Sequence, residues 1–433
     1  MSKTLRSLPV ERYGGTVRVP GDKSISHRAL MIGSLADGDV EISGLALGRD
    51  VLSTLEAMRS LGVEIEREGD SAVVHGLGLE GLSSPDSPID CGNSGTTIRL
   101  LSGLAAGAKL HATLTGDESL MQRPMGRISQ PLRRIGALVQ GREDARFAPL
   151  VIKSRGVRAR SHRLEVASAQ VKSCILLAGL FARGTTEIES PAPNRDHTER
   201  MLEHLGAEIK YDALKVALKG PARLHGGSIN VPGDFSSAAF PVAAAPLIKR
   251  SKVIVQNVGL NPTRTGFLEV LGNMGARFET KNVRVVDNEM VGDLIVRYGQ
   301  LKGCVILGRL IPRTIDELVV LAAMAASAKG RTVIKDAAEL RHKESDRIAS
   351  TVEMVKALGG EASSTDDGMV VQGLGGPLKG GTVHAGGDHR IALAALALGP
   401  GTQEGVSVEG AEAMDVSYPE FVEHISSLGG DIR

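Results

Sequence analysis

Apolar residues fall into short blocks interrupted by single glycines, and one combination recurs six times along the chain. An apolar residue, a glycine and a small or apolar residue follow one another around Gly62, Gly136, Gly206, Gly275, Gly359 and Gly429. These glycines lie 74, 70, 69, 84 and 70 residues apart. A helix-like stretch precedes each of them, and strand-like alternation usually follows, as in residues 53–61 and then 63–66. Because glycine enters the left-handed region without steric cost, the pattern predicts a helix C-terminus at each position.

A second combination also recurs about once per unit: a short strand, a turn of small residues and a helix rich in Ala and Leu. The turns are expected at residues 20–22, 91–93, 167–169, 232–234, 311–313 and 386–388. Some of the helices that follow, such as 318–328 and 391–398, are apolar on every side, which is typical of buried helices. Six units of roughly 72 residues (433/6) therefore account for the whole chain.

The closest internal match is Val-Pro-Gly-Asp, which occurs at residues 19–22 and again at 231–234. Pro-Gly-Asp is a common turn, so one copy would mean little. Two copies at matching places favour a duplication, with two similar α/β domains formed by residues 21–233 and by residues 1–20 plus 234–433. A doubly wound nucleotide-binding fold is less favoured, because no GxGxxG follows a strand and no GxxxxGK[ST] is present.

Composition narrows the class of protein. Apolar residues make up 42% of the chain and charged residues 23%, which is ordinary for a globular protein. Since 51 Lys and Arg face 50 Asp and Glu, no net field attracts nucleic acid or membrane. Only 11 residues are aromatic (7 Phe, 4 Tyr, no Trp), too few for base stacking. The basic run at 142–163 is interrupted by Glu143 and Asp144, so we do not expect nucleic-acid binding there either.

The cysteines and the first residues bear on location. Cys91, Cys174 and Cys304 are far apart and odd in number, which argues against a disulfide framework or a zinc site. The first 15 residues contain no apolar core of a secretory signal, and no apolar run approaches the ~20 residues of a membrane span. We therefore expect a cytoplasmic protein.

Candidate chemistry gathers on or near five of the six turns. Each turn opens a helix, and helix N-termini attract anions through unpaired N–H groups and a partial positive charge. The turns carry GDKSISHR at 21–28, NSGTT at 93–97, SAQVK at 168–172, Asp316 with Glu317, and DHR at 388–390. A single such turn is more typical of a polar helix cap than of an anion site. The repetition at equivalent points is what favours anion binding.

Three further segments combine charges. RPMGR at 123–127 places two arginines around a turn, and a solvated basic loop is the alternative. NRDHTE at 194–199 is typical of a helix start, where the polar residues would act as caps. In RHKESDR at 341–347, Lys343 and Arg347 would share one face of a helix, with Glu344 three residues before Arg347. An exposed, salt-bridged helix surface is the alternative there.

Together these segments resemble the 5-enolpyruvylshikimate-3-phosphate (EPSP) synthase family, also called 3-phosphoshikimate 1-carboxyvinyltransferases. The resemblance runs from about residue 14 to 423 and is carried by GDKSISHR, GNSGTT, RPMGR, SAQVK, RDHTE, NPTRTG (261–266), RHKESDR and GDHR. It implies an α/β fold of two similar domains, each with three βαβαββ repeats in an inside-out α/β barrel, and an active site in the cleft between them. SAQVK, RDHTE and NPTRTG resemble the subgroup that is often less sensitive to glyphosate.

The implied reaction joins phosphoenolpyruvate to shikimate 3-phosphate and releases phosphate, with no metal or organic cofactor. The two substrates bring about −6 in charge near pH 7. Seven basic residues in these motifs supply enough positive charge to balance the substrates. The only partners we expect are these small molecules, with no nucleic acid or membrane, and we expect a monomer.

The resemblance also implies residue roles. Shikimate 3-phosphate would contact Lys23, Ser24, Arg28, Ser168, Ala169, Gln170, Arg195, Asp316 and Lys343. Phosphoenolpyruvate would contact Lys23, Gly95, Arg123, Gln170, Arg347 and Arg390. In catalysis, Asp316 would accept the proton of the substrate hydroxyl and Glu344 would protonate the methylene carbon, while Lys23 or Lys343 would bridge the forming tetrahedral centre.

The chain departs from better-known members at several places. Val416 stands where a lysine often precedes a Thr-Phe-Pro-like stretch, Glu339 replaces an asparagine, and Ala169 replaces a serine of the other subgroup. Gly95 is alanine in some glyphosate-tolerant enzymes, so sensitivity is left open.

Two rival functions are weighed here. A UDP-N-acetylglucosamine enolpyruvyl transferase would need a loop cysteine, and residues 111–123 contain none. A non-catalytic anion-binding protein would not need Asp316 and Glu344, because carboxylates in a pocket for anions are costly.

Overall fold

The computed structural model describes residues 3–433, and the chain in it divides into two compact units. The N-terminal unit consists of Gly21–Val231 together with Val286–Glu289. The C-terminal unit consists of the described residues up to Pro20, of Pro232–Val285 and of Met290–Arg433. Residues 286–289, which the predicted boundaries assign to the C-terminal domain, therefore group with the N-terminal one.

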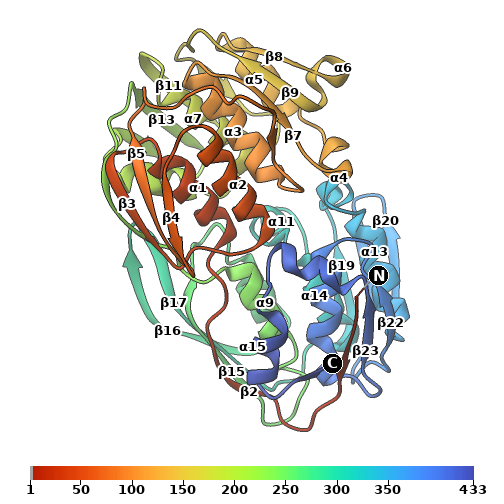
Figure 1. Ribbon diagram of the computed structural model, residues 1–433. Coiled ribbons are helices and arrows are strands. Elements are labelled where there is room, and N and C mark those ends of the chain that lie inside the picture. The colour runs from red at the N-terminus through yellow and green to blue at the C-terminus, as the bar shows by residue number, and fades with distance from the viewer. Residues whose placement is uncertain (1–2) are drawn as a thin grey trace. The chain divides into compact units, whose positions relative to one another are not determined.

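Three four-stranded sheets surround the helices of the N-terminal unit (Figure 1). Their strand orders are β14 (His225–Asn230), β3 (Asp37–Ser43), β5 (Ser71–Leu77), β4 (Ile65–Glu68); β6 (Ile89–Asp90), β7 (His111–Thr115), β9 (Phe147–Lys153), β8 (Leu138–Gly141); and β10 (Ser161–Arg163), β11 (Gly184–Glu189), β13 (Lys215–Gly220), β12 (Ile209–Tyr211). In each sheet the first pair is parallel and the others are antiparallel. The repeated order reproduces the predicted βαβαββ unit.

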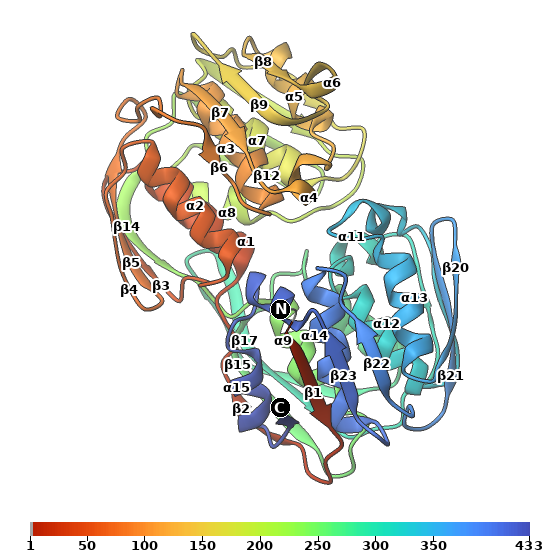
Figure 2. The ribbon, with the colours of Figure 1, turned by 45° about the vertical axis from the view of Figure 1, so that its right-hand side comes forward.

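The C-terminal unit repeats this arrangement with three further sheets. Their strand orders are β2 (Gly14–Val17), β15 (Lys252–Gly259), β17 (Glu289–Arg297), β16 (Arg277–Val286); β18 (Val305–Ile306), β19 (Lys329–Ile334), β21 (Gly368–Leu374), β20 (Glu361–Thr365); and β22 (Gly381–His384), β23 (Val406–Glu409), β1 (Thr4–Leu8), β24 (Asp431–Ile432). Strand β1, dark red in Figure 2, lies beside β23 near the end of the chain. Each unit is thus an inside-out α/β barrel of the predicted class.

Helices fill the interior of each unit, and a few short ones, such as residues 142–145, lie at its surface. Those of the N-terminal unit are α1 (Lys23–Gly33), α2 (Arg49–Ser60), α3 (Gly95–Gly107), α4 (Glu118–Met121), α5 (Gly126–Arg134), α6 (Arg142–Ala145), α7 (Ala169–Gly179) and α8 (His197–His204). The backbones of α3 and α7 approach so closely that a Cβ on Gly103 would lie 2.0 Å from the carbonyl oxygen of Cys174. A glycine is therefore required there.

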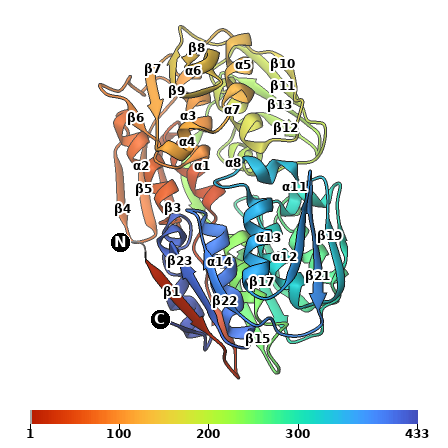
Figure 3. The ribbon, with the colours of Figure 1, turned by 90° about the vertical axis from the view of Figure 1, so that its right-hand side faces the viewer.

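The C-terminal unit has its own set of interior helices. They are α9 (Phe235–Ala243), α10 (Gly266–Asn273), α11 (Leu310–Thr314), α12 (Leu318–Ser327), α13 (Arg347–Ala357), α14 (His389–Leu398) and α15 (Phe421–Ser427), with 3₁₀ turns at Ala338–His342, Gly399–Gly401 and Ala411–Val416. Figure 3 shows α12, α13 and α14 side by side, and every residue of α12 and α14 is buried, as their all-round apolar sequences predict. Among residues 3–433, no helix is both long enough and apolar enough to cross a membrane.

The six repeated glycines end helices as predicted. Their φ angles run from +75° at Gly275 to +112° at Gly136, in the region that favours glycine. At the first of them, the Gly62 N–H donates to the Arg59 carbonyl at 3.0 Å and the Val63 N–H to the Met58 carbonyl at 3.2 Å. This is the hydrogen-bond pattern of a glycine-terminated helix.

The two Pro-Gly-Asp turns mark the places where the chain passes between the units. Strand β2 precedes α1 but pairs with β15 of the C-terminal unit, and β14 precedes α9 but pairs with β3 of the N-terminal unit. In each turn the aspartate, Asp22 or Asp234, caps the following helix. The duplicated motif is therefore a pair of equivalent crossings.

One predicted turn is wrong. Residues 311–313 lie inside the short helix α11, and α12 begins four residues later, after Glu317. Pro312 is tolerated there because the N–H groups of a first helical turn have no partner within the helix.

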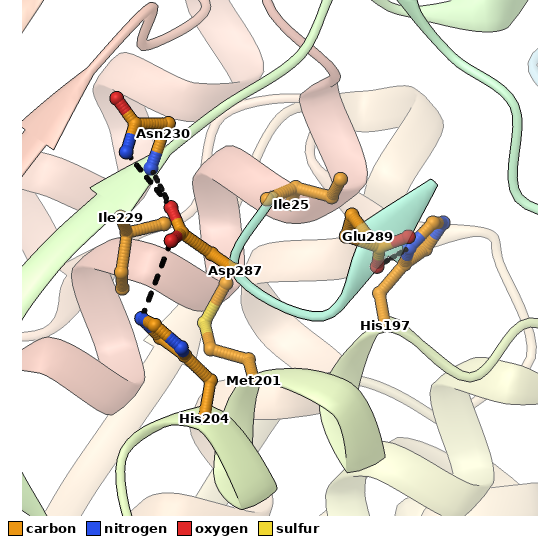
Figure 4. Close-up of a pocket in the computed structure, with 8 residues that line it drawn as sticks. All are labelled: Ile25, His197, Met201, His204, Ile229, Asn230, Asp287 and Glu289. Atoms are coloured by element: carbon orange, nitrogen blue, oxygen red, sulfur yellow. Dashed lines mark hydrogen bonds and ion pairs between the residues drawn. The ribbon is translucent and has the colours of Figure 1, made fainter. Parts of the chain in front are cut away.

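The tip of the β16–β17 hairpin explains why residues 286–289 group with the N-terminal unit (Figure 4). Glu289 lies 2.6 Å from His197 Nδ1 in a buried pair. One carboxylate oxygen of Asp287 accepts from the backbone N–H of Asn230 at 2.7 Å and from its side-chain amide at 2.9 Å. These long-range contacts carry no local sequence signal.

Candidate functional site

The start of helix α1 carries two predicted substrate contacts. Asp22 caps the helix by accepting from the Ile25 N–H at 3.0 Å, which leaves Lys23 and Ser24 in the first turn. The Lys23 ammonium lies 3.0 Å from a carboxylate oxygen of Asp50 on α2. Asp50 thus fixes the position of the cation, a role that no sequence motif indicated.

Arg28, one turn further along α1, is buried among hydroxyl groups from two other helices. Its Nε donates to Thr198 Oγ1 on α8 at 2.6 Å and its Nη2 to Ser173 Oγ on α7 at 2.7 Å. Burial lowers the pKa of Arg28 to about 10, with the charge of Glu199 acting in the opposite direction and that of Arg195 in the same one. The positive charge of Arg195 therefore acts on Arg28.

The N-termini of α3 and α7 meet through Gln170. Its amide nitrogen donates to Thr96 Oγ1 at 3.0 Å, and its carbonyl oxygen accepts from Arg99 Nη1 at 2.7 Å. The predicted residue Gly95 opens α3 beside the same arginine, because a Cβ placed on it would lie 2.9 Å from Arg99 Nη1 and 3.4 Å from Arg123 Nη1. The backbone of Gly95, which carries no side chain, thus lies next to two guanidinium groups.

Arg123 and the start of α7 complete this set in the N-terminal unit. Arg123 is buried, and its Nη2 bonds Asn93 Oδ1 and lies 3.3 Å from Ser119 Oγ. The solvated basic loop considered as an alternative is therefore wrong for this arginine. Ser168 caps α7 through a long 3.4 Å contact with the Val171 N–H, and the half-buried Ala169 begins the helix.

Asp316 is the centre of the second set, which lies in the C-terminal unit. Its Oδ1 is 3.7 Å from Arg347 Nη1 and 3.7 Å from Arg390 Nε. The other end of the Arg390 guanidinium donates to the backbone carbonyl of Asp316 at 2.9 Å. The carboxylate thus lies between two of the predicted phosphoenolpyruvate ligands.

Arg347 is 1% exposed and is held by two more carboxylates. Its Nε donates to Asp388 Oδ2 at 2.8 Å, and its Nη2 contacts Glu344 Oε2 at 2.5 Å. Burial alone would raise the pKa of Asp388, but the charge of Arg347 outweighs it, so that pKa lies below its usual value. Asp388 is ionised and anchors the arginine, a role the sequence did not reveal.

The expectation of one helix over residues 341–347 is wrong. A 3₁₀ turn ends at His342, and α13 begins only at Arg347, since Asp346 caps it by accepting from the Ile348 and Ala349 N–H groups at 3.1 Å. Lys343 therefore shares no helix face with Arg347. Burial, aided by the charge of Arg347, lowers the pKa of Lys343, and the charge of Asp316 opposes that change.

Comparison with known proteins decides the family. The family model described as "EPSP synthase (3-phosphoshikimate 1-carboxyvinyltransferase)" matches residues 9–425. The chain belongs to the EPSP synthase family. A relative from Geobacillus kaustophilus, named 3-phosphoshikimate 1-carboxyvinyltransferase, is 49% identical over 97% of this chain and 98% of its own. One of the same name from Brevibacillus brevis is 47% identical over 96% and 98%.

The fold agrees with that of solved EPSP synthases. A structure of EPSP synthase from Acinetobacter baumannii superimposes with a TM-score of 0.89 at 39% identity and covers all of both chains. A second structure from the same organism gives a TM-score of 0.88, also at 39% identity. The two-domain fold inferred from the motifs is confirmed.

Departures from the pattern of better-known EPSP synthases are local. Val416 is half-buried at the end of a 3₁₀ turn, and Glu339 is exposed. Cys91 is fully buried, and burial raises the pKa of its thiol, which is typical of an unreactive core cysteine. Residues 111–123, where the rival transferase would need a cysteine, contain none.

Potential metal ligands lie elsewhere in this EPSP synthase family member. Among residues 3–433, the group of ligand atoms close enough together to share an ion is formed by Glu64, Glu66 and His75. These residues are exposed or half-buried on the sheet containing β4 and β5. None of them is a candidate site residue.

Proposed function

We propose that the chain transfers the enolpyruvyl group of phosphoenolpyruvate to the 5-hydroxyl of shikimate 3-phosphate and releases phosphate, as a step of the shikimate pathway toward chorismate and the aromatic amino acids. The observation that carries the proposal is the pairing of Asp316 with Arg347 and Arg390 in a chain that matches the EPSP synthase model over residues 9–425. A carboxylate among anion-binding arginines is useful when a proton must be moved beside anionic substrates.

Shikimate 3-phosphate would be held mainly by the N-terminal unit. Lys23, Ser24, Arg28, Ser168, Ala169, Gln170 and Arg195 would contact it. Support comes from the hydroxyl groups around Arg28 and from the helix N-termini of α1 and α7, which favour bound anions. From the C-terminal unit, Asp316 and Lys343 would reach the reacting hydroxyl.

Phosphoenolpyruvate would be clamped by Arg123, Arg347 and Arg390, with Lys23, Gly95 and Gln170 beside it. The planar guanidinium suits carboxylate and phosphate because it can donate two parallel hydrogen bonds. We propose that the two sets of residues act on one substrate pair in a cleft between domain 21–233 and the domain of residues 1–20 plus 234–433.

The chemistry then follows in two steps. The 5-hydroxyl oxygen forms a bond to C2 of phosphoenolpyruvate while its proton passes to Asp316, and Glu344 delivers a proton to the methylene carbon. Lys23 or Lys343 would stabilise the tetrahedral centre. In the second step the methyl group returns a proton to Glu344, the C–O bond to phosphate breaks, and phosphate leaves with the proton from Asp316. Alignment of the two anions can supply roughly 7–11 kcal/mol of the acceleration.

A coupled phosphate assay tests the proposal against its rivals. We expect phosphate release only when phosphoenolpyruvate and shikimate 3-phosphate are both present. Saturable binding of both without phosphate release would favour the non-catalytic anion-binding protein. Release that needs UDP-N-acetylglucosamine in place of shikimate 3-phosphate would favour the other enolpyruvyl transferase.

Arg123→Ala should mainly weaken phosphoenolpyruvate binding. The loss of a charge-assisted hydrogen bond, worth about 1.5–3 kcal/mol, predicts a Kd at least tenfold higher. Isothermal titration with phosphoenolpyruvate in the presence of shikimate 3-phosphate measures the effect when both proteins also carry Asp316→Asn, so that turnover does not consume the ligand. Arg127→Ala in the same motif is the matched control. An unchanged Kd for Arg123→Ala would reject the clamp role.

Gly95→Ala should raise the KM for phosphoenolpyruvate about tenfold and leave that for shikimate 3-phosphate nearly unchanged. The new methyl group would lie 2.9 Å from Arg99 Nη1 and 3.4 Å from Nη1 of Arg123, a proposed contact of phosphoenolpyruvate only, so it would narrow the space for that anion. Steady-state kinetics check this. Gly126→Ala is the control, since a Cβ on Gly126 meets no atom within 4 Å. Equal effects of the two substitutions would contradict the account.

Three narrower assignments are also proposals. Resemblance in SAQVK, RDHTE and NPTRTG favours the subgroup often less sensitive to glyphosate, and an inhibition curve against phosphoenolpyruvate tests this. We further propose that the protein acts as a monomer in the cytoplasm. Sedimentation analysis and cell fractionation test those two assignments.

A further inference from the structure

Two sequence motifs without an assigned role in the reaction meet in the C-terminal unit. They are the second Pro-Gly-Asp turn, which ends at Asp234, and NPTRTG at 261–266. In the second motif, Asn261 Oδ1 accepts from the Thr263 N–H at 2.9 Å, and the Arg264 N–H donates to the Asn261 carbonyl at 2.8 Å. This tight turn directs Arg264 inward, where the residue is only 4% exposed.

One nitrogen of the Arg264 guanidinium is fixed by the beginning of α9. Nη2 donates to Ser236 Oγ at 2.7 Å and lies 3.2 Å from Asp234 Oδ1. Ser236 in turn bonds the buried Glu317, whose Oε1 is 4.0 Å from the same nitrogen. The contacts with Asp234 and Ser236 therefore hold Nη2 of Arg264 at the beginning of α9.

The second terminal nitrogen of Arg264 faces the proposed proton acceptor. Nη1 lies 3.6 Å from Asp316 Oδ2, whereas Arg347 and Arg390 both lie 3.7 Å from Oδ1. The latter two belong to the proposed phosphoenolpyruvate clamp, so that anion would share their guanidinium groups with Oδ1 when it binds. Arg264 is tied to α9 instead, so it stays on Oδ2.

We propose that Arg264 is the positioning residue of Asp316: it holds Oδ2 of the carboxylate and thereby directs Oδ1 toward the substrate hydroxyl. The inference rests on the proposed function, because it takes Asp316 as the proton acceptor. Arginine suits the role because its planar fork joins the Ser236 anchor to Asp316, and a lysine, with a single nitrogen, cannot span both. Arg264 itself contacts no substrate in this scheme.

The test is a double-mutant cycle on the full-length enzyme, measured by phosphate release. Arg264→Ala should lower kcat about 100-fold, the effect of a misplaced reacting group, with both KM values within about twofold of the original enzyme. In an Asp316→Asn background the same substitution should cost nothing further, because residues that act as a unit are not additive. Arg264→Lys should recover part of kcat through its charge.

Controls separate positioning from folding. Arg313→Ala removes an arginine of α11 that supports the same turn by donating to the Pro262 carbonyl at 2.9 Å, and it should leave kcat within about threefold. Calorimetric binding of shikimate 3-phosphate to Arg264→Lys shows whether that variant is folded. If Arg264→Ala cost as much in the Asp316→Asn background as in the original enzyme, the inference would be overturned. Full turnover by Asp316→Asn alone would instead overturn the proton-acceptor role of Asp316, and the inference about Arg264 with it. The proposed reaction would still stand, because the original enzyme would still release phosphate.

Discussion

Asp316→Asn lowers kcat by about two to four orders of magnitude and changes both KM values little, if the proposed mechanism is right. The substitution keeps the shape of the side chain but removes its capacity to accept the proton of the substrate hydroxyl. Arg347 and Arg390 keep their other partners, including the backbone carbonyl of residue 316 for Arg390, so substrate binding should persist. Steady-state kinetics with each substrate varied in turn measure both effects.

Asp366→Asn provides the control for Asp316→Asn. Asp366 is exposed in the same unit, so its loss should leave kcat unchanged. Normal turnover by Asp316→Asn would remove Asp316 from the mechanism. A large rise in KM with an unchanged kcat would make it a binding residue only.

Asp388→Asn should lower the free energy of unfolding by about 3 kcal/mol and weaken phosphoenolpyruvate binding. The reason is that Arg347, buried at 1% exposure, loses the carboxylate that holds its Nε at 2.8 Å. Breaking a buried ion pair leaves a charge without full compensation. Urea denaturation measures the stability, and titration with phosphoenolpyruvate measures the binding.

The effect of Asp388→Asn should depend on pH in a defined direction. Because Arg347 holds the pKa of Asp388 below its usual value, the stabilisation is fully present above the unfolded pKa of about 3.9. It is lost as the pH falls through the lower folded pKa. The difference between the two proteins should therefore shrink only below about pH 4.

An exposed pair supplies the comparison for Asp388→Asn. Asp37→Asn removes the exposed partner of Arg223, an ion pair of 2.9 Å, and should cost less than about 1 kcal/mol. Equal losses for Asp388→Asn and Asp37→Asn would show that Asp388 does not anchor a buried cation.

Features that depend on neighbouring residues could be predicted from the sequence. The six glycines at helix ends are an example, because a positive φ is a property of one residue and its helix. The capping roles of Asp22 and Asp234 are another, since both follow the same short turn. Repetition of such local signals is enough to infer six units and two similar domains.

Features that depend on distant residues could not be predicted. Asp388 and Arg347 are 41 positions apart, and Glu289 and His197 are 92 apart, so no local pattern announces either contact. The error at 341–347 had a readable signal, because Asp346 is a favourable N-cap directly before Arg347. In this segment the spacing of Lys343 and Arg347 indicates one helix, whereas the N-cap residue Asp346 indicates a later start. The helix begins where the N-cap indicates.

The reaction itself is tested most directly by the identity of its product. Purified protein should be incubated with shikimate 3-phosphate and with phosphoenolpyruvate isotopically labelled in its carbon atoms, and the mixture analysed by mass spectrometry. We predict a labelled product that retains the phosphate of shikimate 3-phosphate, together with an equal amount of inorganic phosphate. Binding of both substrates with no labelled product would contradict the account.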